Sequence, residues 1–198
     1  MKTGPKHKLC RRLGSCVWGS PKCPSVKRPY SAGPHGGKRR SKLSTYGELL
    51  MEKQKLRAHY DLTERSLRFV YLKAKKTVGA TGDKLLQDIE MRLASVVWRS
   101  GLAPTIFAAK QAVTHRHVLV DGKVVDRPSY RVVPNQVVSI NGQRSPSIAS
   151  ISKTTDIVPP PYLEVDRENC RVTVSREPLV AEIPCNVEIM RVVEYYAR

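Results

Sequence analysis

The chain has 198 residues, of which 40% are hydrophobic, so it is long enough to bury a modest core. Its formal net charge of +18 and isoelectric point near 10 indicate a polyanionic partner, because such an excess repels itself unless counterions or phosphates lie nearby. No run of eighteen apolar residues is present, so neither a membrane-spanning helix nor a membrane partner is expected, and the five cysteines favour a reducing compartment over a disulfide framework.

Residues 1–43 lie in the most basic part of the sequence and show no apolar periodicity. Residues 1–60 hold fifteen Lys and Arg against two acidic residues, whereas residues 141–198 carry a net charge of −1. Glycines, prolines and three cysteines interrupt residues 1–43, which we therefore expect to be an irregular basic arm. Such an arm needs an outside scaffold, a metal or RNA, to hold one shape. Its first residues lead into no apolar stretch, so no secretory signal is expected.

Helical patterns fill residues 44–91, which are predicted to form a helical domain. Ser44 is placed as the N-cap of a first helix, and residues 61–64 have the spacing of a capping box at the start of a second. Apolar residues then follow at i, i+3, i+4 and i+7 over residues 67–74. A third, continuous helix is predicted over residues 81–101, where a glycine ends it.

Within residues 92–155 the pattern changes from helical to strand periodicity. A short helix is predicted over residues 105–114, and the alternating sequence of residues 117–125 predicts a hairpin. Asp121-Gly122 supplies the positive φ angles that a type I′ turn needs. Further short strands are predicted at residues 130–133 and 137–140, so this domain is expected to be helix, helix and small sheet.

The C-terminal segment, residues 156–198, is predicted to add two strands and a helix. Residues 141–161 are rich in serine and proline and predict a linker. Residues 162–165 and 171–175 alternate like a pair of strands, and a final helix is predicted from Asn186 to Tyr196. The chain is therefore expected to be an α+β protein whose C-terminal hairpin and helix pack back on the body.

Short stretches within these elements resemble a known family in the same order along nearly the whole chain. RLASVVWRSG at residues 92–101 and HRHVLVDGKVVD at residues 115–126 resemble the first helix and the hairpin of the alpha-L RNA-binding motif. More specific stretches resemble small-subunit ribosomal protein four of bacteria and organelles. These are GPHG at residues 33–36, YG at residues 46–47, EKQKLR at residues 52–57 and YLEVD at residues 162–166.

The resemblance implies a structural constituent of the small ribosomal subunit and not an enzyme. It implies a primary rRNA-binding protein that nucleates assembly of the subunit body, packs beside other small-subunit proteins and contributes to decoding accuracy. It also implies a position near the channel through which mRNA enters. The ribosome concerned is expected to be cytoplasmic or, as the alternative, that of an organelle.

Two other classes of RNA-binding protein share the alpha-L motif. A modifying enzyme such as a pseudouridine synthase needs a further catalytic domain, and the residues left after the linker are too few for one. A factor that binds stalled ribosomal subunits would lack the basic arm and the helices at residues 44–80. No Ser/His/Asp set, phosphate-binding loop or paired-carboxylate cleft is evident in the sequence.

Three departures from the family pattern concern single RNA or packing contacts. Ala94 and Ser95 stand where the family has Asp-Asn, and Thr105-Ile106 stands where it has Ser-Arg. The linker at residues 141–161 is short, where relatives often carry a basic helix. Each departure puts one expected contact in question, and none is expected to disturb the fold.

Basic and hydrogen-bonding side chains form the candidate RNA-binding set, because Lys and Arg supply charge to phosphates while duplex RNA is read mostly by shape. Arg92 and Arg99 lie seven apart and are expected to share a helix face, and Lys53 and Arg57 to point outward together. The full set is His35, Gly36, Lys38, Arg39, Arg40, Lys42, Tyr46, Lys53, Arg57, Arg92, Arg99, Lys110, Gln111, His115, Arg116 and His117.

The densest charge in this set follows Gly36, whose missing side chain would let the backbone approach a phosphate. This cluster, residues 38–42, is also expected to help grip or unwind incoming mRNA. A solvated charge run is the alternative reading there, a packed ring is the alternative for Tyr46, and a satisfied surface or core group is the alternative for each histidine.

A candidate zinc site lies in the arm, where His7, Cys10, Cys16 and Cys23 form the pattern H-x2-C-x5-C-x6-C. Zinc takes four nitrogen or sulfur ligands tetrahedrally, and the first spacing is that of a compact knuckle. Some members of the family carry a four-cysteine zinc site in this region, with a histidine here in place of the first cysteine. The alternative is three reduced cysteines in an arm that RNA orders.

Overall fold

The computed structural model describes residues 5–20, 22–36, 43–142 and 144–198, which divide into two compact units. The first unit combines the described residues up to 71 with residues 185–198, and the second comprises the described residues between 72 and 184. The first contains α1 (Lys6–Leu13), α2 (Pro24–Lys27), α3 (Thr45–His59), the first part of α4 (Glu64–Lys76) and α9 (Ile189–Ala197). The second contains the end of α4, α5 (Thr81–Glu90), α6 (Leu93–Arg99), α7 (Ile106–Thr114), β1 (Val118–Val120), β2 (Lys123–Val124), β3 (Val137–Ile140), α8 (Pro146–Thr154), β4 (Leu163–Asp166), β5 (Arg171–Val174) and the 3-10 helix η1 (Val180–Glu182).

The predicted helix starts at Ser44 and near residue 61 are both present. The Ser44 hydroxyl caps α3 by accepting a hydrogen bond from the Gly47 amide at 3.2 Å, as predicted. The second start lies two residues later than predicted, because Asp61 adopts a left-handed φ of 48° and Thr63 accepts the capping bond from Ser66 N at 3.2 Å. The N-cap is therefore Thr63 and not Asp61, while the helix covers the residues that its apolar pattern predicted.

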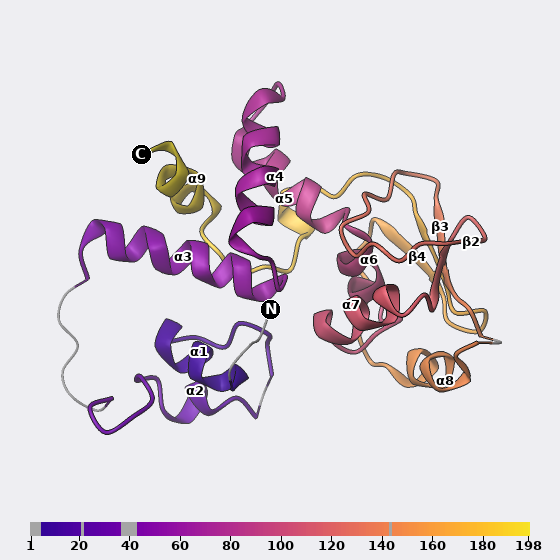
Figure 1. Cartoon of the computed structure of the whole chain (residues 1–198), viewed down its shortest axis with the longest axis horizontal. Helices are drawn as coiled ribbons and strands as arrows, with labels where there is room; N and C mark the ends of the chain where they lie inside the picture. Colours follow the sequence, from indigo (N-terminus) through magenta and orange to yellow (C-terminus); the bar gives the residue numbers. More distant parts are fainter. Residues whose placement is uncertain (1–4, 21, 37–42, 143) are drawn as a thin grey trace. The chain divides into compact units, whose positions relative to one another are not determined.

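Helix α9 packs on α3, so the C-terminal end of the chain belongs to the first unit (Figure 1). The stacked rings of Tyr71 and Tyr196 lie 4.8 Å apart between centroids, and the backbone amide of Glu188 donates to Glu52 Oε2 at 3.1 Å. The predicted C-terminal helix is thus present, but the strands and the helix of residues 156–198 are shared between the two units.

The N-terminal arm contains two short helices, where the sequence predicted irregular backbone. Helix α1 ends at Gly14 in a left-handed conformation with φ 73°, and α2 begins with a proline at its first position. The turn between them docks on the end of α3. There, Trp18 Nε1 donates to the Ala58 carbonyl at 3.2 Å and His59 Nδ1 to the Val17 carbonyl at 2.8 Å. These contacts supply the scaffold that the local sequence lacks.

The helix predicted over residues 81–101 is broken at Met91 and Arg92, so that α5 and α6 are separate. Arg92 has extended backbone with ψ 140° and bridges Arg131 like one rung of a sheet. The Met91 carbonyl accepts from Val132 N, and Leu93 N donates to the Tyr130 carbonyl, both at 2.8 Å. Within the described residues, the 130–133 segment, predicted as a strand, forms only the isolated bridge from Arg131 to Arg92, because backbone groups of Tyr130 and Val132 bond the residues at the helix break.

In the described part of the chain, one antiparallel sheet has the strand order β2-β1-β3-β5-β4. The predicted hairpin is confirmed, with φ 48° at Asp121 and φ 78° at Gly122 as a type I′ turn requires. Strand β5 pairs with β3 in the register Val138↔Val172, so the predicted C-terminal strand pair extends this sheet. Helices α6 and α7 cover one face, and their buried residues form one core with the strands.

Helix α8 occupies part of the predicted linker. Ser150, Ser152 and Thr154 turn their hydroxyls onto backbone carbonyls three or four residues earlier, at 2.8–3.4 Å. Ser152 also donates to the thiol of Cys170 at 3.0 Å, so contact with the sheet unit stabilises a helix of weak intrinsic propensity. Among the described residues, no helix is both long and apolar enough to cross a membrane.

Candidate nucleic-acid interface and thiol cluster

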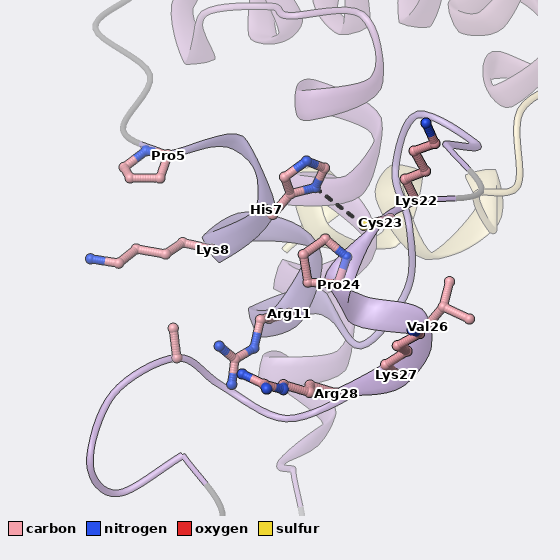
Figure 2. A pocket seen from close by; sticks show the side chains of 11 residues that line it. Pro5, His7, Lys8, Arg11, Lys22, Cys23, Pro24, Val26, Lys27 and Arg28 are labelled. Atoms are coloured by element: carbon pink, nitrogen blue, oxygen red, sulfur yellow. Dashed lines mark hydrogen bonds between the residues drawn. The ribbon is translucent and has the colours of Figure 1, made fainter.

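A hollow of about 770 Å³ lies over the α1–α2 pair of the first unit (Figure 2). Its described lining carries five Lys or Arg side chains and one histidine, and no carboxylate. The cationic side chains come from α1, from α2 and from the residues on either side of α2. The lining residues are Pro5, His7, Lys8, Arg11, Lys22, Cys23, Pro24, Val26, Lys27, Arg28 and Ala32.

Arg11 ties the segment after α2 to α1 and so shapes the hollow. Its guanidinium donates from Nε to the Tyr30 carbonyl at 3.0 Å and from Nη2 to the Ser31 carbonyl at 3.1 Å. The same group lies 4.9 Å from the centroid of the Tyr30 ring. No sequence pattern singles out these basic residues, because they are scattered along the chain and only the fold brings them together.

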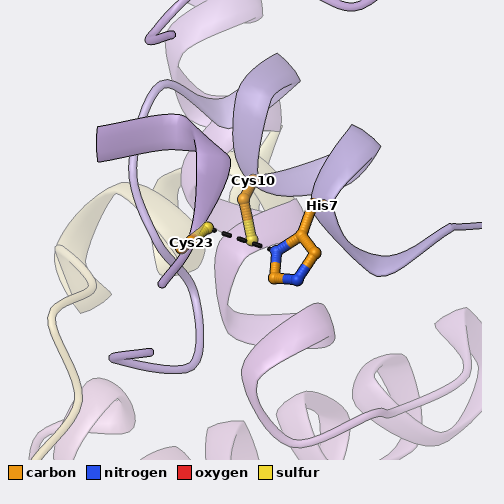
Figure 3. A group of neighbouring side chains, drawn as sticks. All are labelled: His7, Cys10 and Cys23. Atoms are coloured by element: carbon orange, nitrogen blue, oxygen red, sulfur yellow. Dashed lines mark hydrogen bonds between the residues drawn. The ribbon is translucent and has the colours of Figure 1, made fainter. Parts of the chain in front are cut away.

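Three of the four predicted metal ligands come together beside this hollow (Figure 3). The ligand atoms of His7, Cys10 and Cys23 all lie within 4.8 Å of one another, and His7 Nδ1 is 3.3 Å from Cys23 Sγ. Cys10 and Cys23 are buried, with 0% and 2% of their surface exposed. Cys16 stands outside this group, and its thiol donates to the Ser20 carbonyl at 3.7 Å.

The two buried thiols of the cluster differ in acidity. Burial, with a contribution from neighbouring Cys23, raises the pKa of Cys10 to about 11. Burial opposes ionisation of Cys23 too, but hydrogen bonds from the Ser25 side chain and backbone, together with Cys16 and His7, lower its pKa to about 6. A thiolate at Cys23 beside an imidazole and a second thiol is a donor set that can hold a metal ion.

Lys53 and Arg57 of α3 point the same way, toward Glu64, but the predicted outward direction is wrong for Lys53, which is buried with 4% of its surface exposed. Its ammonium lies 3.0 Å from Glu64 Oε1 and 4.3 Å from the centroid of the Tyr195 ring. Arg57 is half-buried and lies 3.5 Å from Glu64 Oε2. The exposed ring of Tyr46 lies 5.7 Å from that of Tyr195, so it has a packed face as well as an open one.

Gly36 is required by the fold of the arm itself. It is buried, its amide donates to the Gly33 carbonyl at 3.1 Å, and a Cβ on it would overlap the carbonyl of Ser31. His35 beside it is exposed. The predicted phosphate cluster of Lys38, Arg39, Arg40 and Lys42 lies outside the described residues.

The predicted shared face of Arg92 and Arg99 is also wrong, because the helix is broken beside Arg92. Arg99 is 7% exposed, and its Nε and Nη2 bind the fully buried Glu90 carboxylate at 3.0 Å and 2.8 Å. Its guanidinium also lies 4.2 Å from the centroid of the Trp98 ring. Arg92 is half-buried, and burial lowers its pKa.

The remaining candidates gather at the C-terminal end of α7. Arg116 adopts a left-handed φ of 63° and pairs with Asp126 at 3.1 Å. The rings of His115 and His117 lie 6.0 Å apart between centroids, and a ring nitrogen of His117 is hydrogen-bonded to the Ser145 hydroxyl. Gln111 is exposed, and Lys110 is half-buried.

The helix pair α6–α7 followed by the β1–β2 hairpin, and the hollow lined by Lys and Arg, are the features of an RNA-binding protein. Residues 1–90 match the Ribosomal protein S4/S9 N-terminal domain family, and residues 91–144 match the S4 domain family. Among similar proteins, one from Ruegeria pomeroyi is 42% identical over all of this chain and 98% of its own length. One from Bifidobacterium longum is 44% identical over 96% of this chain and 95% of its own length, and one from Roseobacter denitrificans is 40% identical over 100% and 98%. All three are named small ribosomal subunit protein uS4, and the chain belongs to that family.

Proposed function

We propose that this protein is a structural constituent of the small ribosomal subunit that binds rRNA. The observation that carries the proposal is the lining of the hollow over α1 and α2, where five Lys or Arg side chains gather without a carboxylate among the described lining residues. Phosphates supply the charge that such a lining needs, and membership of the uS4 family makes rRNA the polyanion concerned.

The proposed rRNA contacts comprise the hollow and the end of α7. Lys53 and Arg99 are left out, because each is buried and bound to a carboxylate of its own unit. Arg57 remains only through the part of its side chain that stays exposed. The retained residues of the predicted set are His35, Gly36, Tyr46, Arg57, Arg92, Lys110, Gln111, His115, Arg116 and His117, with Lys38, Arg39, Arg40 and Lys42 on sequence grounds alone.

Sedimentation of tagged protein from cells tests the proposal. We expect the protein in stoichiometric amount in small subunits after a high-salt wash, because many phosphate contacts act together in the assembled particle. A protein that is present in much less than one copy per subunit, or that the wash removes, contradicts the structural role.

The thiol cluster is proposed to hold zinc, with His7, Cys10 and Cys23 as three ligands. Zinc accepts this mixture of sulfur and nitrogen, and Cys16 is the natural fourth ligand because it lies in the loop that joins α1 to α2 and hydrogen-bonds Cys23. A bound ion would link the two helices and stabilise an arm with few apolar residues to bury.

Metal analysis of the purified protein tests the zinc site. One zinc per chain is expected, with loss in Cys10→Ser and retention in Cys185→Ser, which changes a cysteine outside the cluster. Retention of zinc in Cys16→Ser would leave the fourth position to water or another residue. A metal-free wild-type protein rules the site out.

The family also suggests roles in assembly and at the mRNA channel. We propose that early binding to rRNA nucleates the subunit body, beside other small-subunit proteins, and that the cluster at residues 38–42 contacts mRNA near the channel where it enters. Support for the mRNA contact is the charge of that cluster. Unchanged unwinding of structured mRNA by ribosomes with Arg39→Glu and Arg40→Glu would remove it.

A further inference from the structure

A second, smaller pocket lies in the second unit between α7, α8 and the segment that follows α6. Its volume is about 230 Å³, below the range of about 300–1,000 Å³ that is usual for sites of drug-sized ligands. The pocket is separate from the basic hollow and the thiol cluster, which belong to the first unit. Its lining is Leu102, Ala103, Pro104, Ala108, Gln111, Ala112, His115, His117, Ile148 and Ile151.

The floor and walls of this pocket are apolar, and its polar groups come from the end of α7. Ala108, Gln111, Ala112 and His115 recur at the spacing of one helix face, so small alanine side chains leave the space and longer polar ones border it. Gln111 and His115 are exposed and offer both donors and acceptors. The described lining contains no carboxylate.

Helix α8, one wall of the pocket, is held in place by two side-chain contacts. At its start, Ser145 is hydrogen-bonded to the ring of His117, and along its length Ser152 donates to Cys170 Sγ at 3.0 Å. Ile148 and Ile151 then face the pocket one turn apart. The shape of the pocket is therefore set by helices that are held by side-chain contacts, and not by the conformation of one side chain.

We infer that this pocket takes one unstacked nucleobase of the bound RNA. The inference rests on the proposed rRNA-binding function. A base has a flat apolar face that suits the alanine and isoleucine walls, and polar edges that suit Gln111 and the two histidines. Arg116 lies between the two histidines in the sequence; its side chain is 61% exposed and pairs with Asp126 at 3.1 Å, so the inference rests on the pocket and not on this charge.

A bound nucleobase would make RNA binding at the α7 surface different from binding by phosphate contacts along a duplex. A residue that only contacts phosphate changes how binding depends on salt, whereas a pocket that holds a base contributes affinity with little salt dependence. The two contributions can therefore be measured separately in one titration series.

The test is binding of the full chain to small-subunit rRNA of Bifidobacterium longum at several salt concentrations. Ala108→Phe fills the pocket, Gln111→Ala removes a rim group without filling it, and Val158→Phe adds the same ring at an exposed apolar position outside the pocket. We expect about tenfold weaker binding for Ala108→Phe, a smaller loss for Gln111→Ala and no change for Val158→Phe. The slope of log affinity against log salt is expected to stay that of the wild type in all three.

A second measurement keeps the inference testable if Ala108→Phe unfolds. Wild-type protein is irradiated with 4-thiouridine-substituted rRNA, and crosslinked peptides are expected from residues 102–117 or 148–151. Wild-type affinity in both pocket variants, or crosslinks that avoid these residues, overturns the inference. Pocket variants that bind rRNA normally but fail to enter subunits would assign the pocket to a protein side chain instead. Wild-type protein that shows no salt-dependent rRNA binding would contradict the proposed function itself.

Discussion

The ammonium of Lys53 lies 3.0 Å from the Glu64 carboxylate, which joins α3 to the start of α4 inside the first unit. Lys53 is buried while the Glu64 side chain is 43% exposed, so the pair is shielded on one side only. The Tyr195 ring of α9 covers the same ammonium at 4.3 Å. One charge therefore links three helices, although its sequence position indicates a surface contact.

Replacing Lys53 by methionine is expected to lower the free energy of unfolding by about 1–2 kcal/mol. The variant keeps the apolar stem but loses the ion pair and the contact with Tyr195, and the exposure of Glu64 limits the loss. Urea denaturation measures the change. Arg65→Met on the exposed side of α4 is the matched control and should change stability by less than about 0.5 kcal/mol.

The stability of the first unit is expected to fall in acid through Glu64. Partial burial opposes ionisation of this carboxyl, but the hydroxyl of Tyr196, Lys53 and Arg57 outweigh it and lower the pKa of Glu64 below its ordinary value of 4.5. A lowered folded-state pKa means that the stabilisation is complete above pH 4.5 and is lost as pH falls through the folded value.

Glu64→Gln is the variant that tests this dependence. Its unfolding free energy should be lower than that of the wild type near neutral pH. The difference should shrink as pH falls below 4.5, because the carboxyl is then neutralised first in the unfolded chain and, at its lowered pKa, in the folded protein, where it becomes uncharged like glutamine. A difference that stays constant down to the acid limit would contradict the assignment to Glu64. Tyr196→Phe, which removes the 2.8 Å hydrogen bond to Glu64, should reduce the acid dependence in part.

Within the predicted RNA-binding set, Arg99 is expected to contribute most to the free energy of unfolding, because it pairs with Glu90. Arg99→Ala should cost about 3–5 kcal/mol, because the Glu90 carboxylate is fully buried and would lose its cationic partner. Replacing both residues, as Glu90→Leu with Arg99→Met, should restore much of that loss. Thermal unfolding of the single and double variants, with Arg127→Ala at an exposed position as control, separates these outcomes.

Local sequence patterns predicted the elements of this fold where nearby residues determine them. Ser44 and Asp121-Gly122 each specify a cap or a turn through their own side chain or backbone preference, and the structure confirms both. The sequence pattern did not predict the break between α5 and α6, because the apolar stripe continues through it and the hydrogen bonds that interrupt the helix come from residues distant in sequence, such as Tyr130 and Val132.

The sequence predicted the residues of a candidate site correctly only where they lie in one short segment, as in the thiol cluster. The ligand spacing around Cys10 brought together His7 and Cys23 as expected, although Cys16 stayed outside the group. Charge alone could not separate Arg99, which Glu90 neutralises inside the second unit, from exposed arginines. Burial is a property of the whole fold, and no spacing rule encodes it.

Neutralising the basic hollow is expected to reduce the salt dependence of rRNA binding. Lys27→Gln with Arg28→Gln removes two lining charges, and each phosphate that is no longer neutralised should lower the magnitude of the slope of log affinity against log salt by about 0.7–0.9. Arg131→Gln is the control, since Asp88 and Glu177 already pair with Arg131 at 3.0 Å and its replacement should leave the slope unchanged. Filter binding across a salt series measures both quantities. Equal slopes for the hollow variant and the wild type would mean that the phosphates lie elsewhere, because weaker binding without a change in slope reflects altered packing and not a missing ionic interaction.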